Sequence, residues 1–177
     1  MDDYLIGVLS NIGVVSFVAL SAYLLLLTGV ISFGQQAFFA IGAYAAGIAT
    51  ALWGWPLALA LAWGAASGAA AAVLLGIPTL RLHGLYFSIA TLAFAEMVRI
   101  LFELFRYQVE IDGELVGPNG AEGFRAIRYI FDHNIDAVQF LLLIYVVLAA
   151  TLLGFFVLER SRTGVVFRMI GEDETLA

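Results

Sequence analysis

Residues 4–80 read YLIGVLSNIGVVSFVALSAYLLLLTGVISFGQQAFFAIGAYAAGIATALWGWPLALALAWGAASGAAAAVLLGIPTL, and none of these 77 residues is Asp, Glu, Lys, Arg or His. A soluble domain must place charge along its exposed surfaces, whereas one charge at the centre of a bilayer costs at least about 2.5–3.5 kcal/mol on insertion scales. At roughly 20 residues per crossing, the stretch has room for about three transmembrane helices joined by tight turns. The sequence therefore predicts an integral membrane protein, an all-α polytopic transmembrane helix bundle.

The composition of the whole chain agrees with this fold class. The chain is 63% hydrophobic and 12% charged, far from the usual balance of soluble domains. Its net charge of −6 argues against a nucleic-acid partner. There is no Cys, and the only two His residues, His83 and His133, are far apart in sequence. We therefore expect no disulfide, no metal site and no cofactor.

Polar and turn-forming segments divide the chain into about five expected membrane spans. The spans cover residues 4–31, 37–52, 57–77, 84–102 and 137–158. Trp53-Gly54-Trp55-Pro56 is typical of a turn at the membrane interface, because Trp prefers headgroup depth and Pro cannot continue a helix. The hydrophilic residues 103–136 form an expected extracytoplasmic loop, and residues 159–177 form an expected cytoplasmic segment.

Arginine positions predict the orientation. Arg160, Arg162 and Arg168 follow the last span closely, so the positive-inside rule places the C-terminus in the cytoplasm. Counting back through five spans places the N-terminus outside, where Asp2 and Asp3 are acceptable.

One polar cluster interrupts the uncharged block at Ser32-Phe33-Gly34-Gln35-Gln36. Freed backbone at membrane depth is tolerated only where it is buried in protein or lines a cavity. The cluster is either a broken helix near residues 29–37 that lines a solute path or an ordinary cytoplasmic turn. Under the first interpretation, the candidate path residues are Ser32, Phe33, Gln35 and Gln36.

Glu96 and Arg99 lie three residues apart and therefore on one face of a helix. With a rise of about 1.5 Å per residue, a helix that enters the bilayer near Leu85 places Glu96 roughly 17 Å deep. Ionisable residues at this depth are rare and usually face a bundle interior or a water-filled path. The pair is thus either a polar lining or gate, or an internal ion pair that fixes helix packing. Thr91, on the same span, is a further candidate path residue.

Two other patterns leave alternatives open. Gly64 and Gly68 form one GxxxG spacing, which serves either close packing within the chain or a dimer face. Gly117-Pro118-Asn119-Gly120 is strong turn chemistry in the outer loop, where Pro118 and Asn119 could lie near a docked external partner.

The chain ends with an acidic segment that follows three arginines. Acidic residues after Gly171 suit the first turn of a helix, where the helix dipole favours negative charge. Glu172, Asp173 and Glu174 therefore belong either to a helix that contacts a partner or to a solvated tail.

Four segments together resemble the permease family of ABC importers for branched-chain amino acids, and more closely the M-type of its two permease subunits. They are GVISFGQQAFFAIGAYAAGIAT (residues 29–50), GIPTLRLHGLYFSIATLAFAEMVR (76–99), GPNGAEG (117–123) and RSRTGVVFRMIGEDETLA (160–177). The family continues past GEDETLA through further spans. The resemblance therefore implies that residues 1–177 correspond to the N-terminal part of one transmembrane permease domain.

The resemblance also implies roles and partners. The segment that matches residues 32–43 contributes to the central translocation region, which supports Ser32, Gln35 and Gln36 as lining residues. The segment from Arg168 onward opens the region that sits on the ATPase subunits, which supports Glu172, Asp173 and Glu174 as coupling residues. The implied partners are a second permease subunit, two cytoplasmic ATPase subunits and a periplasmic or extracellular solute-binding protein. The implied location is a bacterial or archaeal cytoplasmic membrane.

We therefore expect a transport subunit without enzymatic activity of its own. The chain has no G-x-x-x-x-G-K-[ST] phosphate-binding loop, so ATP hydrolysis must come from partners. A permease for urea or short-chain amides and a passive channel remain alternatives. A membrane-embedded enzyme is disfavoured, because no nucleophile and base accompany Glu96 and Arg99.

Overall fold

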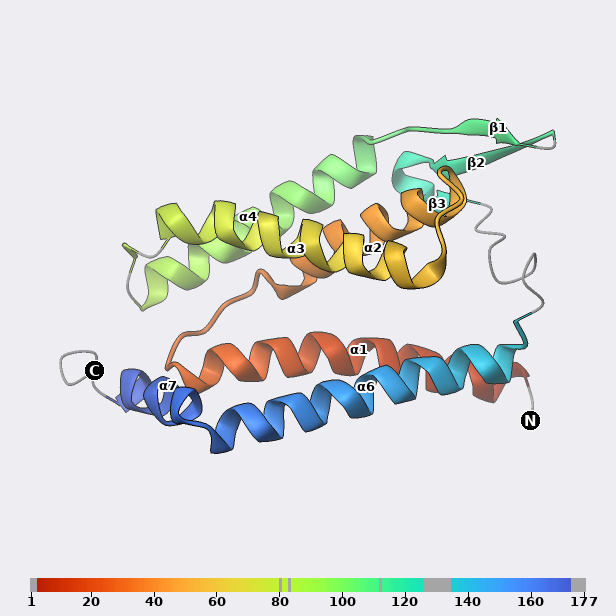
Figure 1. Cartoon of the computed structure of the whole chain (residues 1–177). Helices are drawn as coiled ribbons and strands as arrows, with labels where there is room; N and C mark the ends of the chain where they lie inside the picture. The colour runs from red at the N-terminus through yellow and green to blue at the C-terminus, as the bar shows by residue number, and fades with distance from the viewer. Residues whose placement is uncertain (1–2, 80, 83, 112, 126–134, 173–177) are drawn as a thin grey trace. The chain divides into compact units, whose positions relative to one another are not determined.

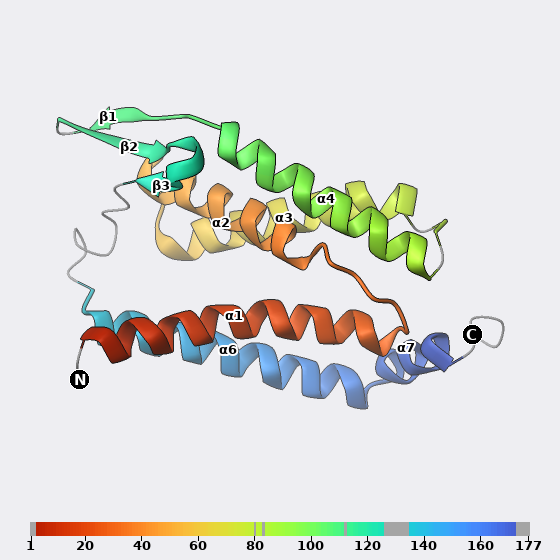
Figure 2. The same cartoon turned by 180° about the vertical axis from the view of Figure 1, so that it is seen from behind.

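The structure is a computed structural model that describes residues 3–79, 81–82, 84–111, 113–125 and 135–172. It is mostly helical and divides into two compact units. We call residues 1–32 and 135–177 the terminal unit, and residues 33–134 the central unit. Figures 1 and 2 show the helices and strands of both units from opposite sides.

The terminal unit pairs two long helices that run in the same direction. Its helices are α1 (Asp3–Leu27), α6 (Ala137–Arg160) and α7 (Arg162–Glu172). The hydroxyl of Tyr145 on α6 donates to the carbonyl of Leu9 on α1 at 3.2 Å. Further along both helices, the hydroxyl of Tyr23 donates to the carboxylate of Glu159 at 2.7 Å. From the first contact to the second, the residue number rises on both α1 and α6, so the two helices are parallel.

The ends of α1 and α6 follow from local sequence. Helix α1 ends at Leu27, where Gly29 adopts a φ of +73° and the amides of Gly29 and Val30 close the last turn. The end lies four residues before the predicted span limit at residue 31. At the start of α6, the backbone N–H of Asp136 donates to the side-chain oxygen of Gln139 at 3.3 Å. Gln139, the one strongly polar residue of this expected span, thus caps the helix.

The acidic segment at the chain end is placed differently from the prediction. Helix α7 begins at Arg162 and ends at Glu172, so Glu172 lies in its last turn and not in the first turn of a new helix. The apolar residues Val165, Val166 and Met169 recur at helical spacing. The helix therefore includes these residues and begins before the acidic segment. Asp173 and Glu174 lie outside the described residues.

The central unit contains three helices of alternating direction and a small sheet. Its elements are α2 (Gln35–Ala51), α3 (Leu57–Thr79), α4 (Leu85–Leu104), β1 (Val109–Ile111), β2 (Glu114–Pro118), the 3-10 helix η1 (Gly120–Glu122) and β3 (Phe124–Arg125). Helix α2 lies antiparallel to α3, with Phe38 near Gly68 and Gly42 near Gly64. It lies parallel to α4.

The contact between α2 and α3 is made by glycine backbone. A Cβ atom on Gly64 would lie 2.6 Å from the carbonyl oxygen of Gly42, and one on Gly68 would lie 3.3 Å from the carbonyl oxygen of Phe38. Small residues let helices approach closely in lipid. We call this contact of Gly42, Gly64 and Gly68 the glycine seam. Both glycines of the GxxxG spacing therefore pack within the chain.

The contact between α2 and α4 is made by larger side chains. Phe38 packs on Phe94 with ring centroids 5.4 Å apart, and Tyr44 stacks on Phe102 at 4.0 Å. Phe94 and Phe102 also pack against a small buried core of Ala37, Ala95 and Val98.

Within the predicted outer loop lies a small sheet that the sequence did not indicate. Strands β1, β2 and β3 pair antiparallel in that order, with Val109 opposite Val116 and Gly117 opposite Arg125. The strands are only two to five residues long, so their alternation is too short to stand out from a loop. The sheet and the Trp53–Pro56 turn lie at the same end of the central unit, beside the last turns of α2 (Figure 1).

Helices occupy all five ranges that the sequence marks as spans. Four of them, α1, α3, α4 and α6, are long and apolar enough to cross a membrane. Helix α2 has 17 residues, or about 26 Å at the usual rise, slightly less than the roughly 30 Å of a bilayer core. Residues 28–34, which precede α2, are not helical.

Candidate functional site

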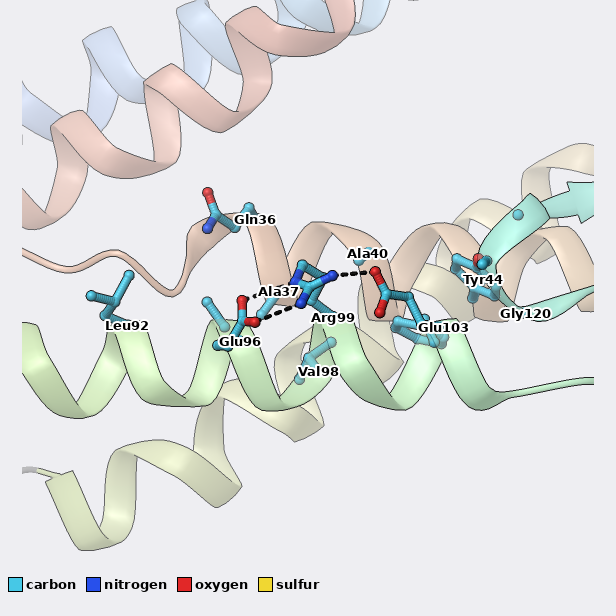
Figure 3. Close-up of a pocket in the computed structure, with 14 residues that line it drawn as sticks. Gln36, Ala37, Ala40, Tyr44, Leu92, Glu96, Val98, Arg99, Glu103 and Gly120 are labelled. Atoms are coloured by element: carbon cyan, nitrogen blue, oxygen red, sulfur yellow. Dashed lines mark hydrogen bonds and ion pairs between the residues drawn. The ribbon is translucent and has the colours of Figure 1, made fainter.

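Three charged side chains form a row along one face of α4. Arg99 donates to both carboxylate oxygens of Glu96, from Nε at 2.9 Å and from Nη2 at 2.6 Å, and it also pairs with Glu103 through Nη1. Figure 3 shows Arg99 between the two carboxylates. We call these three residues the charged row. Glu96 and Arg99 were predicted as a pair, and the structure confirms that they meet.

The charged row borders a pocket of about 400 Å³ in the central unit (Figure 3). The pocket lies between α2, α4 and η1, and most of its wall is apolar. Its lining residues are Gln36, Ala37, Ala40, Tyr44, Leu92, Ala95, Glu96, Val98, Arg99, Phe102, Glu103, Gly120, Ala121 and Gly123. Two carboxylates and one guanidinium are the charged groups among these described residues, so the lining carries a net charge of −1.

The sheet region closes one end of the pocket because η1 packs on the last turn of α4. Gly120 adopts a φ of +61°, and a Cβ atom there would lie 2.7 Å from the carbonyl oxygen of Glu103. Only glycine suits both demands. The GPNGAEG segment thus carries η1 against the charged row.

The segment before α2 is tied to α4 by a buried threonine. The backbone N–H of Phe33 donates to the hydroxyl of Thr91 at 3.1 Å, and this hydroxyl donates to the carbonyl of Ser88 at 3.0 Å. Thr91 is only 2% exposed. The structure therefore brings together Thr91 and Phe33, two of the predicted path residues, although their role in transport stays a prediction.

The two glutamines at the start of α2 have different surroundings. Gln36 lines the pocket, whereas Gln35 is buried and its side-chain nitrogen has no hydrogen-bond partner within the described part of the chain. Buried amide groups normally find a partner. Ser32 belongs to the terminal unit and does not line this pocket.

The other predicted residues are not among those that line the pocket. Pro118 is buried in the sheet region, and the side-chain nitrogen of Asn119 donates to Glu122 at 2.6 Å. Arg168 and Glu172 lie in α7. Among the described residues, no group of three His, Cys, Asp or Glu side chains could hold a metal ion.

Glu103, the third member of the charged row, was not predicted as a site residue. Glu103 lies four residues after Arg99, which is the helical spacing of an ion pair. This spacing indicates an ion pair, but the predicted span ended at residue 102, and Glu103 was therefore placed in the outer loop. The ring contacts of Tyr44 with Phe102 had no comparable signal, because they join residues far apart in sequence.

Comparisons with known proteins agree on one family. Residues 4–177 match a family model described as "Branched-chain amino acid transport system / permease component". Over 94 residues, the chain is 42% identical to the "High-affinity branched-chain amino acid transport system permease protein LivM" of Escherichia coli (strain K12), and the protein of that name from Salmonella typhimurium (strain LT2) gives the same values. The aligned region covers 53% of this chain but 21% of each relative, so the chain matches about a fifth of their length. No solved structure gives a significant match.

Proposed function

The chain belongs to the family of branched-chain amino acid transport permeases, and on this premise we propose that it forms part of the membrane path of an ABC importer for branched-chain, hydrophobic amino acids. As a family member, it is a non-catalytic transport subunit that spans the membrane several times. The finer proposal concerns its solute, its path residues and its partners.

The charged row beside the pocket is the observation that carries the proposal. Ionisable groups within membrane helices are expensive and usually line a path or a bundle interior. The charged row borders a pocket whose remaining wall is mostly apolar, which suits a solute with charged and hydrophobic parts. The proposed path residues are Ser32, Phe33, Gln35, Gln36, Thr91, Glu96 and Arg99.

Helix directions support five crossings. Since α1 and α6 are parallel, the chain between them must cross the membrane an odd number of times. The central unit offers α2, α3 and α4 in alternating directions, which makes three crossings. If the short α2 did not cross the membrane, only two crossings would separate α1 from α6, and these two helices would have to be antiparallel. We therefore infer that α2 crosses the membrane together with the non-helical segment before it.

The proposed orientation places the C-terminus in the cytoplasm and the sheet outside. Arg160 is the last residue of α6 and Arg162 follows the helix, which favours a cytoplasmic end. The Trp53–Pro56 turn and the sheet lie at one end of the central unit, as this orientation requires. The sheet, including Asn119, would then contribute to the surface that receives a solute-binding protein. Because Pro118 is buried, its role there would be to shape the sheet.

Helix α7 is the proposed contact with the ATPase subunits. It exposes Val165, Val166 and Met169, which are 41–52% accessible. An amphipathic helix with an exposed apolar side favours contact with a partner groove or the membrane interface. The proposed coupling residues are Arg168, Glu172, Asp173 and Glu174.

An uptake experiment tests the solute class. Cells of the source organism that lack the gene for this chain should lose ATP-dependent uptake of radiolabelled L-leucine, and restoring the gene should restore uptake. Loss of urea or acetamide uptake in place of leucine uptake would assign the alternative solute class. Gene-dependent uptake that persists in ATP-free membrane vesicles would indicate a passive channel. Unchanged uptake of all three solutes would contradict the proposal.

A further inference from the structure

We propose that the charged row of Glu96, Arg99 and Glu103 binds the ammonium and carboxylate groups of a zwitterionic α-amino acid. This inference rests on the proposed function, because it names the contacts that an amino-acid solute would make. It assigns the carboxylate of the solute to Arg99 and its ammonium group to Glu103.

Arg99 keeps hydrogen-bonding capacity for a ligand. Its guanidinium has five N–H groups, and three of them are used by Glu96 and Glu103. Within the described part of the chain, two N–H groups remain without an acceptor, one on each terminal nitrogen. Arginine recognises carboxylates through such pairs of donors. The side chain of Arg99 is 54% accessible, so a solute in the pocket can reach it.

The second carboxylate gives the site its selectivity for a cation. Glu96 is engaged through both oxygens, whereas Glu103 is engaged through Oε1, and its Oε2 accepts no hydrogen bond from the described residues. The pocket lining carries a net charge of −1, which an ammonium group would neutralise. In surroundings of low dielectric constant this attraction is stronger than in water.

The apolar wall would receive the side chain of the solute. Tyr44 and Phe102 stack on each other beside Glu103, and Leu92 and Val98 extend the wall along α4. The volume of about 400 Å³ lies within the usual range of small-molecule sites. A wall of this kind beside paired opposite charges matches a hydrophobic α-amino acid better than it matches urea, which is neutral and has no apolar part.

Helix stability alone does not explain the charged row. Ion pairs at i,i+3 and i,i+4 with half-exposed side chains contribute little to stability. Ionisable groups at membrane depth, which is where Glu96 and Arg99 are expected, are nevertheless costly to insert. A structural pair also needs only one carboxylate, and the second one leaves an uncompensated charge. Ligand binding accounts for both the second carboxylate and the two remaining N–H groups of Arg99.

Ligand-observed NMR on the full chain in lipid nanodiscs tests the site. The probes are L-leucine, 4-methylpentanoate, which lacks the ammonium group, and 3-methylbutylamine, which lacks the carboxylate. Saturation transfer above that of empty nanodiscs measures binding. We expect L-leucine to bind about tenfold more tightly than either analogue, since one charged contact is lost in each. Equal responses from the three probes, or no response to L-leucine, would overturn the proposal.

Substitutions separate the two assigned contacts. Glu103→Gln should weaken L-leucine and 3-methylbutylamine about tenfold and leave 4-methylpentanoate unchanged. Glu110→Gln is the matched control, because Glu110 is an exposed glutamate of β1 that does not line the pocket. An equal loss of all three probes in Glu103→Gln would show a general disturbance and contradict the assignment.

A triple variant guards against misfolding. Glu96→Gln, Arg99→Gln and Glu103→Gln together remove every charge of the row without leaving an unpaired partner. L-Leucine binding should be lost in this variant, whereas retained binding would overturn the site. If uptake depends on the chain but wild-type L-leucine binding is absent, the site is wrong and the proposed function stands. If binding is present but uptake does not depend on the chain, the proposed function fails alone.

Discussion

Helix α2 meets its two neighbours in opposite ways. Against α3 it presents backbone, at the glycine seam of Gly42, Gly64 and Gly68. Against α4 it presents rings and leaves a pocket, with Tyr44 stacked on Phe102 and the charged row alongside. Both contacts belong to one compact unit and share one helix.

The two contacts differ in role: the α2–α3 contact holds helices together, and the α2–α4 contact borders the proposed solute site. In lipid there is no hydrophobic drive between helices, so close backbone approach and dispersion contacts must hold them together. The glycine seam provides this approach and leaves no room for a solute. The α2–α4 contact is made mainly by ring pairs, and a charged pocket remains beside it. Thr91 ties the segment before α2 to α4. We therefore expect stability to depend on the α3 side and solute binding on the α4 side.

The largest loss of stability is expected at the glycine seam. In Gly64→Val, the new Cβ would lie 2.6 Å from the carbonyl oxygen of Gly42, a backbone atom that cannot move aside without displacing the helix. Overpacking of this kind costs about 3 kcal/mol. Unfolding by SDS in mixed micelles can be followed by the fluorescence of Trp53 and Trp63, which lie in contact near the α2–α3 turn.

Gly76→Val is the matched control for this substitution. Gly76 lies in the same helix, and a Cβ atom there meets no heavy atom of the described residues within 4 Å. It shares the change in helix propensity but lacks the clash. If the two variants unfold at the same SDS concentration, close approach at Gly64 does not hold α2 to α3.

The next largest effect is expected at Thr91, on the α4 side. Thr91→Val keeps the shape of the side chain but leaves the backbone N–H of Phe33 without its acceptor. The hydrogen bond is partly buried, so leaving its donor unsatisfied costs about 1–2 kcal/mol. The same SDS titration measures this loss. We expect, in addition, faster amide hydrogen exchange at Phe33.

Thr50→Val separates this contact from a general effect of losing a hydroxyl. Among the described residues, the hydroxyl of Thr50 donates only to carbonyls of its own helix, at Ala46 and Gly47. Its replacement should therefore change the free energy of unfolding by less than about 0.5 kcal/mol. Equal losses in the two valine variants would mean that Thr91 does not anchor the segment before α2.

The sequence was sufficient for features that depend on local spacing or on hydrophobic length. The uncharged block predicted the membrane helices, and the SFGQQ cluster predicted the interruption that the structure places at residues 28–34. The spacing of Glu96 and Arg99 predicted their ion pair. Each of these signals lies within one helix or at its end.

Features that join distant segments were not predictable in the same way. The spacing of Gly64 and Gly68 indicated a small-residue face but not that Gly42 of α2 covers it. The hydrogen bond from Phe33 to Thr91 spans 58 residues and has no local signature. Strands β1, β2 and β3 were hidden because each is too short to show alternation. Only tertiary contacts decide such features.

A smaller effect is expected from the stacked rings of the α2–α4 contact. Tyr44 and Phe102 have ring centroids 4.0 Å apart and an interplanar angle of 19°. A double-mutant cycle of Tyr44→Leu and Phe102→Leu should give a coupling energy of about 1 kcal/mol in the SDS titration. A coupling energy near zero would show that the rings line the pocket without holding the helices together.

The smallest effect on stability is expected at the charged row, where the effect on L-leucine binding is expected to be largest. Replacing Glu96, Arg99 and Glu103 together by Gln should leave the SDS midpoint of unfolding at the wild-type value, because half-exposed pairs contribute little and no charge is left unpaired. Arg99→Gln alone should lower the midpoint, since it leaves two neighbouring carboxylates on one helix face without their cation. Comparing the SDS midpoints of these two variants shows whether the charged row lines the path or fixes helix packing. If the triple variant is as unstable as the single one, the charged row holds α4 in place. Stability would then depend on the α4 side as well as on the α3 side, contrary to our expectation. If the triple variant keeps the wild-type midpoint but no longer binds L-leucine, the charges serve the solute.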